Sequence, residues 1–257
     1  MMIRWALALM MLVTALPARA QPVRGPSMAW NPSADYVTAG QDEPGYATWL
    51  AAQSFRPMFV RGFENFLTNQ GLSGIVPTWQ LLRTATDWQK CSAQPFEAPP
   101  PNEWVNLVET LKYIRAHVIP VIGPVEPVSV YRNPVLNACA GGAAESAHRQ
   151  LFAIDLVPLK PTGREDMIRG LCAIHAWRGT GFDVGMGFYK GLRFHVDSKK
   201  FRKWGTDGSG SALACTDVLA DLNAQAAANR APIVAIPIAM EPLAPTLTPA
   251  PVNLPIP

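Results

Sequence analysis

Three residues of the chain have side chains suited to bind a metal ion together. His148 and Asp155 are separated by six residues in the segment SAHRQLFAIDL, and His195 follows in the later segment RFHVD. Asp155 stands in an apolar run, where a carboxylate without a partner is costly to bury. Two imidazoles and a carboxylate are ligands that zinc accepts, and three protein ligands leave a fourth position open, as in catalytic sites. A zinc site is therefore one interpretation of these residues.

A structural interpretation of the same residues stays open, because the spacing His-x6-Asp alone is a weak signal. Asp155 could accept backbone hydrogen bonds, and each histidine could be a satisfied surface or core residue. His175 shares an apolar helical face with Ile168 and Leu171, so we expect it in the core.

The residues around this spacing resemble a known enzyme family. The zinc D-alanyl-D-alanine metallopeptidases carry the pattern Ser-x-His-x-x-Gly-x-Ala-x-Asp and a second histidine on a later strand. Here Ser146, His148, Ala153 and Asp155 take the corresponding positions, and His195 takes the place of the second histidine.

Two further segments are similar to that family and occur in the same order. Residues 129–134 (SVYRNP), followed by Asn137, resemble its Ser-Gly-Tyr-Arg-Ser-Pro segment. Residues 185–197 (GMGFYKGLRFHVD) resemble its glycine-rich hairpin, which ends in His-Val-Asp. The resemblance covers about residues 102–205, and four motifs in the correct order make it more specific than any one of them.

The resemblance implies zinc bound by His148, Asp155 and His195, which activates water to attack a peptide carbonyl. The substrate would be a peptidoglycan stem peptide cleaved at a bond that involves D-alanine, by carboxypeptidase or endopeptidase action. Arg132 would stabilise the developing oxyanion or hold the substrate carboxylate. Ser146 would contact the substrate or support the ligands, although a plain turn serine fits equally well.

The chain departs from the family pattern at two positions. The family glycine is replaced by Leu151, and Leu192 stands where many members carry the general-base glutamate, three residues before the last histidine. Asp197 lies on the same side of its strand as His195 and is the nearest replacement for the base. It could equally orient His195 or pair with Arg193. A non-catalytic, zinc-containing module of the same fold that binds the cell wall is therefore the alternative function.

The first 20 residues have the features of a signal peptide. Arg4 precedes a short apolar run, and the residues Ala18-Arg19-Ala20 suit a signal peptidase, so cleavage is expected after Ala20. The apolar run is too short for a membrane span, and no later segment is long and apolar enough. We therefore expect an exported protein, periplasmic or extracellular, without a transmembrane segment in the mature chain.

Charge and cysteine content agree with that compartment. Loss of Arg4 and Arg19 from the 22 basic residues leaves 20 against 19 acidic residues, a net charge of +1, so a nucleic-acid partner is not expected. Four cysteines in an oxidising compartment favour two disulfides, with three pairings open. The cysteines are Cys91, Cys139, Cys172 and Cys215.

The pattern of helices and strands predicts an α+β fold, with a small, mostly antiparallel sheet, flanking helices and a helical N-terminal region before it. The expected helices cover residues 46–69, 102–119, 162–177 and 216–230, and the expected strands cover 127–131, 152–159, 184–189 and 192–197. The predicted segments are a signal peptide (1–20), a flexible leader (21–44), a helical region (45–101), a zinc peptidase domain (102–205), and a helix with a proline-rich tail (206–257).

Overall fold

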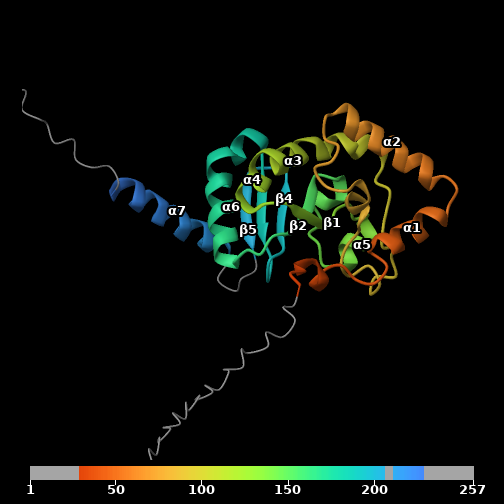
Figure 1. Cartoon of the computed structure of the whole chain (residues 1–257), viewed down its shortest axis with the longest axis horizontal. Coiled ribbons are helices and arrows are strands. Elements are labelled where there is room, and N and C mark those ends of the chain that lie inside the picture. The colour runs from red at the N-terminus through yellow and green to blue at the C-terminus, as the bar shows by residue number, and fades with distance from the viewer. Residues whose placement is uncertain (1–28, 206–210, 229–257) are drawn as a thin grey trace, which may run out of the picture.

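One five-stranded sheet with helices around it forms the fold, in a computed structural model that describes residues 29–205 and 211–228 (Figure 1). The strand order is β1-β2-β4-β3-β5, and only the β3–β5 pair of this sheet is parallel. The α+β prediction with a mostly antiparallel sheet is confirmed. The strands are β1 (Val125–Ser129), β2 (Ala153–Pro158), β3 (Gly185–Phe188), β4 (Phe194–Asp197) and β5 (Arg202–Gly205).

The helices of the N-terminal region lie at one end of the molecule, and the last helix extends from the opposite end (Figure 1). In the described part of the chain, no helix has the length and apolar character needed to cross a membrane. The predicted signal peptide, the start of the leader and the proline-rich tail lie outside the described residues. The α-helices are α1 (Glu43–Ala51), α2 (Arg56–Asn69), α3 (Leu107–Tyr113), α4 (Ile119–Ile122), α5 (Pro134–Cys139), α6 (Arg164–Arg178) and α7 (Ser211–Ala228).

The two faces of the sheet have different chemistry. Asp155 of β2 is paired with His195 of β4, and the next pair on the same face is Ala153 with Asp197. The alternate positions, such as Ile154 and Val196, belong to the apolar core, and α3 contacts both strands. Since side chains alternate across a strand, one face is apolar and the other carries ionisable groups.

Two glycines of β3 make room on the ionisable face. Gly187 is paired with His195, and a Cβ atom at Gly187 would lie 2.4 Å from the ring of Trp204. Gly185 is paired with Asp197, and a Cβ atom there would lie 2.1 Å from Asp197 Oδ2. The glycine-rich sequence of this strand is therefore required by the side chains that cross it.

The helix predicted from Asn102 to Pro120 differs in detail. It begins as a 3₁₀ turn, η3 (Pro101–Asn106), without a side-chain cap from Asn102. It then passes through α3 and a π-helical turn, η4 (Ile114–Val118), into α4, which contains Pro120. Proline has no N–H to donate in a helix, and Pro120 lies in the first turn of α4, the position where a helix tolerates proline best.

The helix expected over residues 162–177 is present as α6 (Arg164–Arg178), and Thr162 does not cap it. Thr162 Oγ1 donates to Lys160 O at 2.9 Å, and Gly163 takes the N-cap position without a side-chain hydrogen bond. The helix depends instead on its apolar face, which includes Met167 and Leu171 in the core.

The described part of the predicted leader packs on the rest of the fold. We call residues 29–42 the N-terminal strap. Trp30 Nε1 donates to Pro158 O at 3.3 Å, and Tyr36 Oη donates to Lys190 O at 2.9 Å. Gln41 is fully buried, and its amide nitrogen lies 3.3 Å from Ala85 O and from Pro95 O. The strap has no core of its own, but its side chains form hydrogen bonds with backbone carbonyls of the rest of the fold.

Two disulfides are present, as predicted, and the structure resolves their pairing. Cys91 is bonded to Cys139 of α5, and Cys172 of α6 is bonded to Cys215 of α7. Each bond closes a loop of more than 40 residues and typically contributes about 2–4 kcal/mol to stability. The first joins the N-terminal region to the loops around the site, and the second holds α7 on α6.

Candidate metal centre

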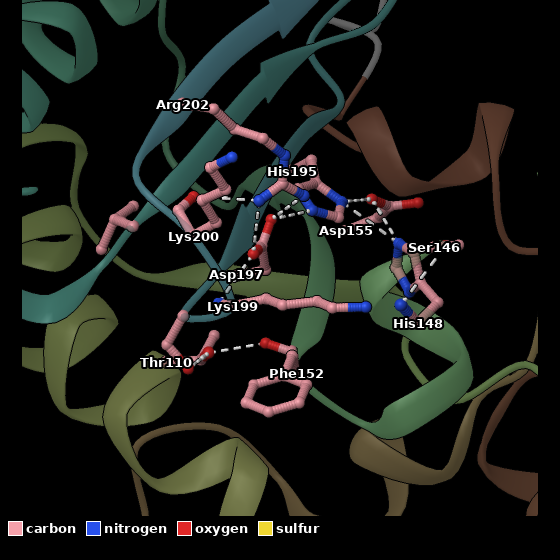
Figure 2. Close-up of polar contacts among 12 residues, drawn as sticks. Thr110, Ser146, His148, Phe152, Asp155, His195, Asp197, Lys199, Lys200 and Arg202 are labelled. Atoms are coloured by element: carbon pink, nitrogen blue, oxygen red, sulfur yellow. Dashed lines mark hydrogen bonds and ion pairs between the residues drawn. The ribbon is translucent and has the colours of Figure 1, made fainter. Parts of the chain in front are cut away.

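The three predicted metal ligands converge on the ionisable face of the sheet. His148 Nε2 lies 3.2 Å from Asp155 Oδ1, His195 Nδ1 lies 3.0 Å from the same oxygen, and the two imidazole nitrogens are 3.2 Å apart. All three side chains are buried, and together they form a group that could hold a metal ion. Figure 2 shows Asp155 between the two imidazole rings. We call His148, Asp155 and His195 the ligand cluster.

The outer nitrogen of each imidazole ring has an acceptor that fixes the tautomer. His148 Nδ1 donates to Val130 O at 2.5 Å, so its Nε2 carries a lone pair in the neutral ring. His195 Nε2 donates to Asp197 Oδ2 at 2.8 Å, so its Nδ1 carries a lone pair. With neutral rings, all three inward atoms of the cluster are acceptors, an arrangement that a metal ion between them would stabilise.

The separations within the cluster also suit zinc. A tetrahedral ion with bonds of about 2.0–2.1 Å has ligand atoms about 3.3 Å apart. The observed separations of 3.0–3.2 Å are close to this value. The cluster therefore fits a tetrahedral metal ion in both chemistry and size.

Burial and neighbouring charges shift the pKa values of the cluster. Burial, assisted by the charge of Arg132, lowers the pKa of His148 to about 4, so this ring is neutral at pH 7. Burial would lower the pKa of His195 too, but hydrogen bonds to Asp155 and Asp197 raise it. Burial opposes ionisation of Asp155, yet the neighbouring His148 and Arg132 hold its pKa well below the ordinary value. The cluster thus keeps a carboxylate, and a metal ion competes only with a proton on His195.

Asp197 lies behind His195, on the side away from the ligand cluster (Figure 2). Its carboxylate accepts both terminal nitrogens of Arg202, at 3.0 and 2.8 Å, and the backbone N–H of Lys199 at 2.9 Å. Burial would raise the pKa of Asp197, but the bonds from His195 and Arg202 lower it to about 2. This geometry fits the orienting role and not the base, and the ion-pair partner is Arg202 rather than Arg193.

Arg132 and Ser146 lie beside the ligand cluster and line the same cavity. Arg132 forms an ion pair with Asp155 Oδ2 at 2.5 Å and donates to Ser129 Oγ at 2.9 Å. Ser146 is the N-cap of the short turn η5 (Ala147–Gln150), where its hydroxyl accepts from His148 N at 3.4 Å. Both residues therefore hold ligands in place, and their contacts with substrate stay predictions.

Leu151 follows this turn at the position where the resembled family has glycine. Its φ of 56° lies in the left-handed region that glycine adopts most easily, and its side chain is fully buried. The loop thus keeps the backbone shape that glycine would allow, at a cost of about 1–2 kcal/mol. Burial of the leucine side chain offsets that cost.

A cavity of about 520 Å³ opens beside the ligand cluster, and several of its walls were not predicted. Tyr189 Oη donates to Asp155 Oδ1 at 3.1 Å, and the ring of Trp204 lies 5.0 Å from that of His195. Trp204 is on β5, which the sequence analysis did not predict. The lining residues comprise Ala85, Thr86, Asp87, Arg132, Ala140, Gly141, Gly142, Ala143, Glu145, Ser146, Ala147, His148, Tyr189, Arg193, His195, Arg202 and Trp204.

The position of the missing glutamate carries no carboxylate in the structure either. Leu192 is partly buried and packs against the apolar core. Among the described residues that line the cavity, the carboxylates are Asp87 and Glu145, and both are exposed on loops.

Comparison with known proteins gives no relative: no family model matches the chain, and no curated protein or solved structure matches it.

Proposed function

We propose that the chain is a zinc-dependent peptidase that hydrolyses peptidoglycan stem peptides at bonds involving D-alanine. The observation that carries this proposal is the ligand cluster, in which three lone-pair atoms face one another within 3.0–3.2 Å, an arrangement that a metal ion would stabilise. The resemblance of residues 102–205 to the zinc D-alanyl-D-alanine metallopeptidases supplies the reaction class. The two disulfides and the predicted signal peptide agree with action outside the cytoplasm.

The chain's own residues would divide the work as follows. His148, Asp155 and His195 would hold the zinc, which supplies Lewis acidity and lowers the pKa of water toward 7 when bound. Asp197 keeps the lone pair of His195 Nδ1 turned inward. Arg132, already beside Asp155, would present its guanidinium to the oxyanion that develops on the scissile carbonyl. The cavity of about 520 Å³ has room for a short peptide.

A non-catalytic wall-binding module of the same fold is the second candidate. Two observations favour it. Leu192 packs against the core where the resembled family often carries its base. Asp197 accepts hydrogen bonds from His195 and Arg202. Such a module would hold zinc and bind stem peptides without cleaving them.

The proposal is tested by metal content and cleavage together. Purified protein is expected to hold about one zinc ion per chain by elemental analysis, and His148→Ala is expected to lose it. His117→Ala is the matched control, because His117 lies in η4 against Tyr113 and Phe182, outside the cluster. Zinc-loaded protein is then incubated with purified stem peptides, and released D-alanine and cross-link fragments are measured by mass spectrometry.

The outcomes separate the candidates. Zinc that is lost only in His148→Ala, with cleavage stopped by a chelator, supports the peptidase. Zinc with peptide binding but no cleavage supports the wall-binding module. Protein that never binds a stoichiometric metal ion contradicts both.

A further inference from the structure

Arg193 lies in the wall of the cavity between two tyrosine rings. Its guanidinium carbon is 3.9 Å from the ring centre of Tyr189 and 5.2 Å from that of Tyr36. Tyr189 belongs to the turn after β3, whereas Tyr36 belongs to the N-terminal strap. Two segments far apart in the sequence therefore enclose this one cation.

Both rings are held by hydrogen bonds of their own. Tyr36 Oη donates to Lys190 O at 2.9 Å, and Tyr189 Oη donates to Asp155 Oδ1 at 3.1 Å. Gly191, with a φ of 71°, leaves room for the first contact, because a Cβ atom there would lie 2.5 Å from Tyr36 Oη. The guanidinium is thus positioned before any ligand arrives, which reduces the entropy that binding would cost.

The charge of Arg193 has no anionic partner in the described part of the chain. Arg132 and Arg202, the other arginines that line the cavity, are paired with Asp155 and Asp197. No described carboxylate lies within ion-pair distance of Arg193, and its Nε is buried without a hydrogen-bond partner among the described residues. A partly buried guanidinium without an anionic partner is suited to bind a carboxylate, which can accept hydrogen bonds from two of its N–H groups in parallel.

We propose that Arg193 is a specificity-determining residue that binds a free carboxylate of the substrate. The Tyr189 side chain links Arg193 to the ligand cluster, since its ring lies against Arg193 and its hydroxyl donates to Asp155. The bound carboxylate would therefore lie close to the scissile bond, a placement that rests on the proposed function. The carboxylate could be the C-terminus of the peptide or an acidic side chain.

Binding of three non-cleavable peptides of equal length tests the proposal and distinguishes these sources. Their backbone amides are N-methylated. One peptide has a free C-terminus and no acidic side chain, the second has a glutamate and an amidated C-terminus, and the third has neither. Dissociation constants are measured by calorimetry for the full chain, for Arg193→Gln and for Arg178→Gln. Arg178 is the control because it is an exposed arginine that also lies over an aromatic ring, Trp177, outside the cavity.

The wild-type protein is expected to bind one acidic peptide about tenfold more tightly than the neutral peptide, and the preferred peptide identifies the source of the carboxylate. Arg193→Gln keeps a side chain that can pack on Tyr189 and is expected to lose this preference, whereas Arg178→Gln keeps it. Thermal melting checks that each variant is folded. If Arg193→Gln does not fold, Arg193→Lys is used, which keeps the charge but not the fork and should reduce the preference.

Equal binding of all three peptides by the wild type would overturn the inference. A preference that survives in Arg193→Gln would do the same and would assign the carboxylate to another cation. The test is independent of the proposed function, because neither zinc content nor cleavage enters the comparison of dissociation constants. Loss of the preference in a protein that never cleaves a peptide would leave the Arg193 assignment in place and reject the peptidase.

Discussion

The ligand cluster and the wall of the cavity beside it are built from different kinds of structure. Asp155 and His195 face each other on paired strands, and His148 is held by a capped turn and by Val130. The wall comes mostly from loops and from the short strand β5, and it includes Asp87 and Glu145, which are exposed. Tyr36 of the N-terminal strap lies against Arg193, one of the wall residues. The cluster can therefore be rigid while the wall supplies the groups that differ between substrates and reactions.

The largest expected effect comes from removing the proton acceptor. It tests whether a residue of the cavity wall takes part in catalysis. We predict that Glu145→Gln lowers kcat on a stem peptide by about 10²- to 10⁴-fold, the usual contribution of a general base. Glu145 directly precedes Ser146, the N-cap of the turn that carries His148, and its carbonyl accepts from Lys199 Nζ at 3.2 Å. Zinc content should stay unchanged, because Glu145 is not a ligand.

Asp87→Asn is the matched control for this prediction, with an expected change in kcat of less than about tenfold. Asp87 is the other exposed carboxylate of the wall. A large loss in Asp87→Asn and not in Glu145→Gln would assign the base to Asp87. Full activity in both variants would show that the wall supplies no base.

The second-largest expected effect is on zinc affinity, and it comes from changing Asp197, which supports the ligand cluster. We predict that Asp197→Asn weakens zinc binding by about 10- to 100-fold, because His195 loses the carboxylate that fixes its tautomer. Competition with a chelator of known affinity measures the change. Asp183→Asn, at an exposed position after η6 (Gly179–Phe182), should leave the affinity unchanged. An unaltered affinity in Asp197→Asn would mean that the other contacts of His195 orient it sufficiently.

The smallest expected effect concerns His175, a buried histidine that is not part of the ligand cluster. His175 is fully buried, stacks on Phe201 and donates to Val184 O at 2.8 Å, and burial lowers its pKa. The unfolded chain then binds a proton below about pH 6.5 that the folded chain resists. The stability contributed by neutral His175 is therefore present above pH 6.5 and is lost as the pH falls below it.

Denaturant unfolding of the wild type and His175→Gln at several pH values, both with a chelator present, measures this contribution. Glutamine keeps a donor for Val184 O but does not titrate. The free energy of unfolding of the variant should fall less steeply between pH 6.5 and 4 than that of the wild type. Parallel curves would show that the remaining titratable groups account for the whole acid sensitivity.

Local sequence patterns, together with the resemblance to the zinc metallopeptidases, identified the three residues of the ligand cluster, which the structure brings together. His148 lies in a short turn and Asp155 lies on the strand that follows it, and the hairpin around Lys190 and Gly191 brings His195 to the strand beside Asp155. Local patterns did not predict the residues that form the wall of the cavity. Strand β5 is only four residues long and pairs in parallel with β3, so it shows no hairpin signal, and Trp204 was missed with it. Nothing in the composition of the strap indicated that Tyr36 would contact a residue 154 positions away.

Where the backbone differs from the prediction, packing within the complete fold explains the result. A π-helical turn before α4 allows Pro120 to lie in that helix rather than end the previous one. Leu151 takes a left-handed conformation that its residue type disfavours, because the turn of His148 and the burial of its side chain require it. Such features depend on contacts that form only when the whole fold is present.

The N-terminal strap has a practical consequence for engineering this protein. A truncated chain that begins at α1, the first α-helix, would keep the sheet, both disulfides and all three metal ligands. It would nevertheless lose Tyr36, one of the two rings that enclose Arg193, and Gln41, whose amide contacts two backbone carbonyls beneath the surface. Shortened versions made for crystallisation or screening would then report normal metal loading alongside altered ligand selectivity.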